Sequence, residues 1–295
     1  DRLGFIDPEC ATQNAFGDRY LTDLCPSNPE VRAYACALAS DIGRYEVATI
    51  FAESLHFHGL RHGYHHERYF EELGTIGVYL LGVCFCTHCL AAARRTGVDA
   101  EAVHRSVCDE LERRLADGEC SEGSKELTRD GLAAIGGERL LRYLDARIET
   151  VTSLAAQVSA AAGAGTNVTF LDLSGAEKGF ATGHPAGDAV PTIGWQMGID
   201  VTTLVKACDI IEATGYAADP DRLGFDLDAY RYLLSDTSRL GLMLRPMPPD
   251  CRSADNLVTK VALARERGLK RIDFYHYGFC RLRSLDWVRQ SLIAV

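Results

Sequence analysis

The sharpest chemical pattern in the sequence is a cluster of cysteines between residues 84 and 89. The segment reads Cys84-Phe85-Cys86-Thr87-His88-Cys89, so three thiols follow a CxCxxC spacing. Three thiolates at this spacing can converge on one Zn²⁺, and one further ligand would complete a tetrahedron. Cys25, just ahead of an expected helix, is the candidate for that ligand. Because an all-sulfur site is closed to substrate, we expect a structural zinc held by Cys25, Cys84, Cys86 and Cys89.

The other cysteines show no comparable pattern. The chain has 11 cysteines, an odd number, in a sequence too long to need a disulfide scaffold. This usage indicates a reducing compartment, and we expect a cytoplasmic protein. Reduced, partly buried thiols without a metal are the alternative interpretation of the cluster. His88 is an alternative ligand in place of one cysteine.

A second group of reactive side chains follows the apolar run Val47–Ala52, which is typical of a buried parallel strand. Glu53 comes directly after this run. A carboxylate at the end of a buried strand is costly unless it has partners or a task, so Glu53 is our first candidate for a nucleophile or an acid/base. We expect the residues that follow it to contact substrate: His56, His62, Tyr64, His65, His66 and Glu67.

The histidine-rich segment admits two other interpretations. In one, Glu53 is a structural carboxylate that hydrogen-bonds the histidines; in the other, the histidines and Glu53 hold a catalytic metal ion. The letters HGYHHE do not match the HExxH spacing of zinc proteases. Contacts with substrate hydroxyls or hydrogen bonds that stabilise the loop are therefore the more ordinary roles.

Four later apolar runs also carry polar or aromatic groups near their ends. The runs are 167–171, 209–213, 240–244 and 271–275, and the groups are Asp172, Glu212, Arg245, Tyr275 and Tyr277. Cleavage of a glycosidic bond needs two carboxyl groups across the scissile bond. Glu53 paired with Glu212, or with Asp172 on the adjacent strand, would supply them. Arg245, Tyr275 and Tyr277 would then contact the sugar.

The elements that position these groups alternate between short apolar runs and helical patterns, which favours βαβ units and a parallel sheet. The five runs fit a (β/α)₈ barrel as strands four to eight if the opening residues are the tail of a third strand and the first strands lie upstream. We expect one domain over residues 1–295, with a His-, Cys- and helix-rich insertion at 54–165 after strand four. The alternative is an open doubly wound sheet, but the sequence has no GxGxxG or Walker motif.

The composition of the chain limits the classes of molecule that it is expected to bind. The chain has 295 residues, 47% of them hydrophobic, and a formal charge of −10. It therefore has enough apolar residues for a large core, and it lacks the basic excess that nucleic acids and anionic membranes attract. No stretch approaches the ~20 apolar residues of a membrane span. We expect a carbohydrate or glycoside as partner, with self-association into a homo-oligomer left open.

Several of these segments together resemble bacterial hypothetical glycoside-hydrolase-like (β/α)₈ families. The matching segments are 24–32, 45–53, 84–89 and Phe274-Tyr275-His276-Tyr277-Gly278. The CxCxxC with a distant cysteine is similar to the structural zinc site of zinc-containing β-galactosidases. The resemblance implies a barrel, a carboxylate pair at strand ends and zinc at the four cysteines. The leading hypothesis is a glycosidase; a metal-dependent barrel hydrolase or lyase and a non-catalytic carbohydrate-binding barrel are the alternatives.

Overall fold

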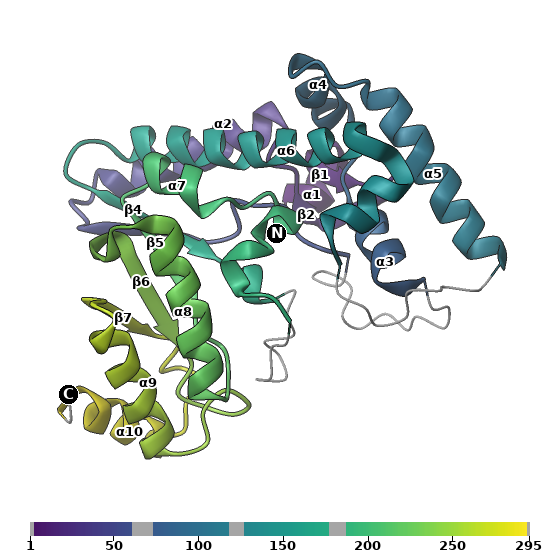
Figure 1. Cartoon of the computed structure of the whole chain (residues 1–295). Helices are drawn as coiled ribbons and strands as arrows, with labels where there is room; N and C mark the ends of the chain where they lie inside the picture. The colour runs from purple at the N-terminus through teal and green to yellow at the C-terminus, as the bar shows by residue number, and fades with distance from the viewer. Residues whose placement is uncertain (1–2, 61–72, 118–126, 177–186, 294–295) are drawn as a thin grey trace. The chain divides into compact units, whose positions relative to one another are not determined.

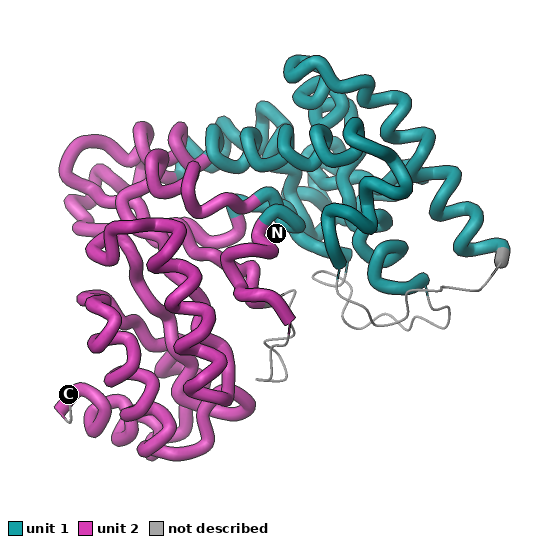
Figure 2. The backbone as a smooth tube through the Cα atoms, viewed as in Figure 1, with its two compact units in different colours: residues 1–38, 55–154, 195–198 teal, residues 39–54, 155–194, 199–295 magenta. Residues whose placement is uncertain are grey.

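The computed structural model describes residues 3–60, 73–117, 127–176 and 187–293. The chain divides into two compact units (Figure 2). Unit 1 consists of Asp1–Leu38, Leu55–Leu154 and Trp195–Gly198, and unit 2 of Ala39–Ser54, Ala155–Gly194 and Ile199–Val295. Most of unit 1 falls within the segment 54–165 that the sequence assigns to an insertion.

Unit 1 is mainly helical (Figure 1). Its helices are α1 (Leu3–Ile6), α3 (Gly74–Gly82), α4 (Thr87–Arg95), α5 (Ala100–Asp117) and the greater parts of α2 (Pro29–Gly43) and α6 (Arg129–Ala162), with a 3₁₀ turn η1 (Pro8–Cys10). The start of α2 follows from its sequence, because Asn28 accepts a hydrogen bond from the Glu30 N–H at 2.8 Å and a proline occupies the first helical position.

The opening residues differ from the sequence prediction. They were expected to be the tail of a third barrel strand, but Leu3–Ile6 form α1, and β1 (Ala11–Gln13) pairs antiparallel with β2 (Arg19–Leu24). The polar turn between these strands, in which Asn14 accepts hydrogen bonds from the Phe16 and Asp18 N–H groups, explains the hairpin. These residues therefore add a separate two-stranded sheet and no strand to the parallel sheet.

Among the described helices, none is by itself both long and apolar enough to span a membrane. The helices α3 and α4 meet the length and composition test only when taken together, and they are bent by 97° relative to each other.

Unit 2 is built on a parallel sheet of five strands in the order β3-β4-β5-β6-β7. The strands are β3 (Thr49–Ala52), β4 (Asn167–Asp172), β5 (Ile210–Thr214), β6 (Leu240–Leu244) and β7 (Arg271–Phe274). The helices are α7 (Val201–Ala207), α8 (Pro220–Leu234), α9 (Ala254–Glu266) and α10 (Leu282–Ile293), with 3₁₀ turns η2 (Ser174–Ala176), η4 (Val190–Thr192) and η6 (Thr237–Arg239), and η5 (Gly194–Met197) divided between the units. The predicted βα alternation is confirmed. The described residues contain five parallel strands, fewer than the eight that close a full barrel.

The two faces of the sheet have different roles. On one face, Ala213 and Leu242 are buried against α8, which presents Leu227 to them. The opposite face carries polar side chains, because alternate residues of a strand point to opposite faces. Glu212 is in register with Gly241, which is in register with Arg271, so these three positions form one row across that face.

The sheet is curled so that its polar face is concave. Arg271 lies on the edge strand β7, yet its guanidinium is 4.6 Å from the ring centroid of Phe51 on the other edge strand, β3. In a flat sheet these strands would be about 19 Å apart, four spacings of ~4.8 Å. One arginine side chain cannot span that distance, so the strands must curve around the polar face.

Candidate functional site

Unit 1 brings together the four cysteines that the sequence singles out. The sulfur atoms of Cys25, Cys84, Cys86 and Cys89 all lie within 4.8 Å of one another, and all four residues are buried. Cys25 Sγ is 3.5 Å from the sulfur atoms of Cys86 and Cys89 and 3.9 Å from that of Cys84. Four sulfur atoms bound to one ion at ~2.3 Å form a tetrahedron with edges of about 3.8 Å. The spacing therefore fits a single metal ion and leaves no room for a larger cluster.

The local structure also suits thiolates. Cys86 is the N-cap of α4, where the helix dipole favours negative charge, and the Gln13 N–H lies 3.3 Å from Cys84 Sγ as a donor. Burial raises the pKa of Cys25 well above its ordinary value, whereas hydrogen bonds from Cys25, Cys84 and Cys89 lower the pKa of Cys86. Four buried sulfur atoms this close cannot all be ionised without a cation, so the cluster has the chemistry of a metal site.

The predicted ligand set is thus confirmed as a group of four residues that could hold a metal ion. His88, the alternative ligand, is not among the residues of this group. An ion bound by all four sulfur atoms would have a complete tetrahedron, with no coordination position left for a substrate.

In unit 2, three predicted site residues lie around Tyr216, which follows β5. The guanidinium of Arg245 is 4.6 Å from the centroid of the Tyr216 ring. Burial raises the pKa of Tyr216; Arg245 lowers it, and Tyr275, Asp250 and Glu53 raise it. Glu53, Arg245 and Tyr275 therefore lie close enough to act electrostatically on one phenol, at the carboxyl end of the sheet.

Glu53 is exposed directly after β3, two residues beyond Phe51 of the concave face. Ser54 then has a positive φ of 63°, which turns the chain sharply after the carboxylate. Arg245 is ion-paired with the buried Asp250, which fixes it beside Tyr216. This end of the concave face therefore offers one exposed carboxylate beside an aromatic ring and a fixed cation.

Glu212 lies in the middle of β5 and is fully buried, although the sequence predicted a residue of the rim. Its Oε2 is 3.5 Å from Nε of Arg271, and neither carboxyl oxygen has a hydrogen-bond donor. The pKa of Glu212 is raised to about 9, chiefly by burial and next by the Asp273 carboxylate, against the lowering effect of Arg271. This raised pKa favours the protonated form of Glu212 at neutral pH.

Asp172 faces away from this group. It is in register with Ala213, so its side chain points to the face covered by α8. The carboxylate accepts hydrogen bonds from the Ser174 N–H at 2.8 Å, the Ser174 hydroxyl at 2.5 Å and the Tyr230 hydroxyl at 2.6 Å. Burial raises its pKa, and these hydrogen bonds lower it. This is the environment of a carboxylate that connects β4 to α8.

The other predicted substrate contacts are distributed differently. His56 is buried in unit 1, with Nδ1 3.0 Å from the Phe57 carbonyl oxygen. Tyr277 is 81% exposed beyond β7, and Tyr275 is 39% exposed. His62, Tyr64, His65, His66 and Glu67 lie outside the described residues.

The sequence reasoning missed three residues of the concave face: Gly241, Arg271 and Asp273. Arg271 and Asp273 begin a run interpreted only as a buried strand, and their period of two could have shown that they share a face. Gly241, inside a buried strand, could have indicated a close approach of another group. A Cβ at position 241 would in fact collide with Oε2 of Glu212.

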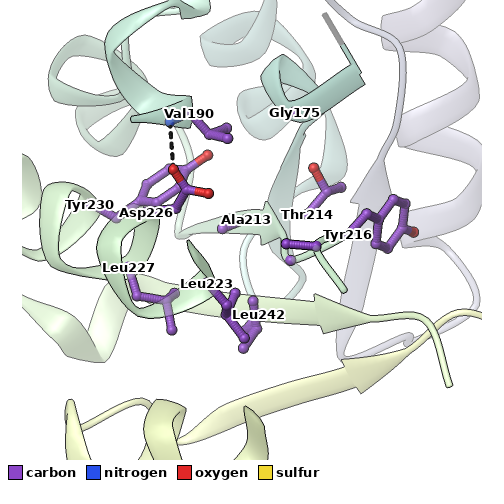
Figure 3. Close-up of a pocket in the computed structure, with 12 residues that line it drawn as sticks. Gly175, Val190, Ala213, Thr214, Tyr216, Leu223, Asp226, Leu227, Tyr230 and Leu242 are labelled. Atoms are coloured by element: carbon purple, nitrogen blue, oxygen red, sulfur yellow. Dashed lines mark hydrogen bonds between the residues drawn. The ribbon is translucent and has the colours of Figure 1, made fainter. Parts of the chain in front are cut away.

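A pocket lies on the opposite face, between the sheet and α8 (Figure 3). It is lined mainly by apolar side chains such as Leu223, Leu227 and Leu242, and it has room for only about one water molecule. At its margin, Asp226 accepts a hydrogen bond of 3.0 Å from the Val190 N–H. We interpret this pocket as a packing gap beneath α8 and not as a substrate site.

The described residues define an α/β protein whose curled parallel sheet has a polar concave face. The fold is similar to that of the catalytic domain of β-amylase from Paenibacillus polymyxa, with a TM-score of 0.57 and 11% sequence identity. The match covers 99% of this chain and 76% of that chain. No protein-family model and no curated protein sequence matches the chain. At this identity, the likeness shows the fold alone.

Proposed function

We propose that this protein is a glycosidase-like hydrolase that acts on a carbohydrate at the concave face of unit 2. The observation that carries the proposal is the pair of contrasting carboxyl groups there, an exposed one at Glu53 and a buried one at Glu212 whose pKa is raised. Two carboxyl groups kept in different protonation states are what acid/base cleavage requires. The similarity to a β-amylase catalytic domain supports this class of reaction and membership of the sheet in a (β/α)₈ barrel.

In this proposal, Glu53 accepts a proton from the attacking water, and Glu212 is the source of the proton for the leaving group. Glu212 fits the second role better than Asp172, because Asp172 is held by Ser174 and Tyr230 on the opposite face. Arg245, Tyr216 and Tyr275 would contact the sugar. Aromatic faces beside a few fixed polar groups are typical of small-molecule sites.

The test is a broad panel of glycosides assayed with the parent protein and with Glu53→Gln. The control is Asp286→Asn, which changes an exposed carboxylate on α10 to the same degree. We expect turnover by the parent and the control and its loss in Glu53→Gln. Equal turnover by all three proteins would remove Glu53 from the mechanism, and saturable sugar binding without turnover would favour the carbohydrate-binding alternative. The metal-dependent alternative depends on histidines mainly outside the described residues, and no specific observation favours it.

We also propose that the four-cysteine site holds Zn²⁺ in a structural role, and that the protein is cytoplasmic, as its cysteine usage suggests. Tetrahedral sulfur sites suit zinc, and bound zinc would supply a positive charge that neutralises the buried thiolates. Elemental analysis of the purified protein should find one zinc per chain. Cys280→Ser, outside the cluster, should retain it, and Cys25→Ser should lose it. An equal metal content in the two variants would contradict the assignment.

A further inference from the structure

Asp273 and Glu212 meet at one arginine. Nε of Arg271 lies 2.7 Å from Oδ2 of Asp273 and 3.5 Å from Oε2 of Glu212. The same guanidinium is held in place by Nη1, which donates to the Thr169 hydroxyl at 3.0 Å, and by the Phe51 ring beneath it. The two carboxyl groups are therefore brought to one fixed cation from β5 and β7.

Gly241 makes this approach across β6 feasible. It stands between Glu212 and Arg271 in the row of registered positions, and its missing side chain leaves the space that Oε2 of Glu212 occupies. Any other residue at this position would push the Glu212 carboxyl group away from β7. The glycine thus lets two acidic strands interact across the one between them.

The two carboxyl groups differ in access. Glu212 is fully buried, and the Asp273 side chain is 36% exposed. Phe51 and Tyr275, at 40% and 39% exposed, present aromatic surface on the same face. A ligand on the concave face can therefore touch Asp273, whereas Glu212 can reach it only through a neighbouring group.

The charges around Glu212 and Asp273 indicate that these two carboxyl groups hold one proton between them. Among the described residues, the charged groups that act on Glu212 are Asp273, which disfavours its ionisation, and Arg271, which favours it. Both lie on β7. One guanidinium can balance one carboxylate, and a second buried negative charge would have no counterion, so one proton must stay in the pair.

We propose that Glu212 and Asp273 form a carboxyl pair that shares one proton, and that Asp273 is its catalytic member, the acid that touches the leaving group of the glycoside. The substrate in this inference rests on the proposed function. As the glycosidic C–O bond breaks, the single proton of the pair passes from Glu212 to Asp273, and Asp273 gives it to the leaving oxygen. Water forms the new bond to the anomeric carbon and gives its proton to Glu53. Solvent then carries that proton back to the pair.

The first test compares glycosides with good and poor leaving groups. A nitrophenolate leaves without a proton, whereas an alkoxide needs one. We expect Asp273→Asn to lower kcat on an alkyl glycoside by about 10²- to 10⁴-fold and to change kcat on the nitrophenyl glycoside much less. In the same variant, the titration of the general acid should disappear from the pH dependence of kcat on the alkyl glycoside. Equal losses on both substrates would overturn the catalytic role, because a structural defect does not depend on the leaving group.

The second test needs no turnover. In protein labelled with ¹³C at glutamate carboxyl groups, NMR should show one glutamate that titrates far above the others and that is absent in Glu212→Gln. In Asp273→Asn its midpoint should move to lower pH, because the like charge is gone and Arg271 is free to pair with Glu212. Asp286→Asn should leave it unchanged. An unchanged midpoint in Asp273→Asn would overturn the shared proton.

The two tests separate the possible failures. A parent protein that hydrolyses neither substrate would overturn the proposed function, and the titration would still decide whether the pair shares a proton. Normal turnover on both substrates by Asp273→Asn would overturn this inference and leave Glu53 as a catalytic candidate.

Discussion

The two units hold their reactive groups in opposite ways. In unit 1, the sulfur atoms of four buried cysteines face one another in one closed cluster. Three of these cysteines lie within six consecutive residues. In unit 2, the acids of the concave face lie on β5, on β7 and directly after β3, far apart in sequence, and two of the three, Glu53 and Asp273, are open to solvent. A closed set of ligands suits a structural ion, whereas an open set with unequal protonation suits a reaction. From this contrast we propose that the cysteine site stabilises the fold and that the concave face carries the chemistry.

The largest expected effect comes from breaking the closed site. Cys86→Ala removes one of the four clustered sulfur atoms, at the N-cap position of α4, and the metal should be lost with it. Structural zinc contributes about 10 to 16 kcal/mol of apparent binding energy, so unit 1 should lose its cooperative thermal transition. Calorimetry together with elemental analysis measures this, with Cys280→Ser as the control. A metal-free Cys86→Ala that melts like the parent would contradict a structural role.

The next effect should appear in catalysis without a loss of stability. Glu53 is exposed, so Glu53→Gln should change the free energy of unfolding by no more than about 0.5 kcal/mol. Its kcat should fall by about 10²- to 10⁴-fold, because acid/base groups contribute on this scale. Steady-state kinetics and chemical denaturation of the same samples measure both quantities. A variant that unfolds easily would make Glu53 a structural residue, like the cysteines of unit 1.

A smaller effect should follow from filling the space above Gly241. In Gly241→Ala the new methyl group meets Oε2 of Glu212, and overpacking of this kind costs about 1 to 3 kcal/mol. Shortening the neighbour in Gly241→Ala/Glu212→Ala should recover much of that cost, which a double-mutant cycle would show as a coupling energy. Strictly additive changes in unfolding free energy would mean that the two residues do not meet.

The last effect is spread over several pH units and concerns the pH dependence of stability. The folded-state pKa of Glu212, about 9, lies above its value in an unfolded chain, so its contribution is fully present below about pH 4.5 and is lost as pH rises toward 9. The slope for one such group is at most about 1.4 kcal/mol per pH unit. Glu212→Gln cannot ionise, so its unfolding free energy should fall less with pH than that of the parent. Parallel pH curves would show that Glu212 is not held protonated.

The contrast between the units also explains what the sequence could predict. The four clustered cysteines could be predicted because the CxCxxC spacing places three sulfur atoms together through local chain geometry. Cys25 was the candidate for the fourth ligand because it precedes a predicted helix. The five parallel strands followed from short apolar runs. The face of the sheet on which each side chain lies could not be predicted in the same way. The run that ends at Asp172 is apolar almost throughout, so it does not show which residues point to which face, and a shift of one position exchanges the two faces. The register of β5, β6 and β7 brings Asp273 close to Glu212, and the sequence alone does not show that register.

The most direct test of the central claim is the configuration of the sugar first released, followed by proton NMR of its anomeric hydrogen. In the proposed step, water attacks the anomeric carbon directly, with Glu53 as the base and Asp273 as the acid. A single displacement of this kind inverts the configuration at that carbon, whereas a covalent intermediate on a carboxylate retains it. The account predicts that the first product has the inverted configuration. A first product with the retained configuration, or no sugar product at all, would contradict it.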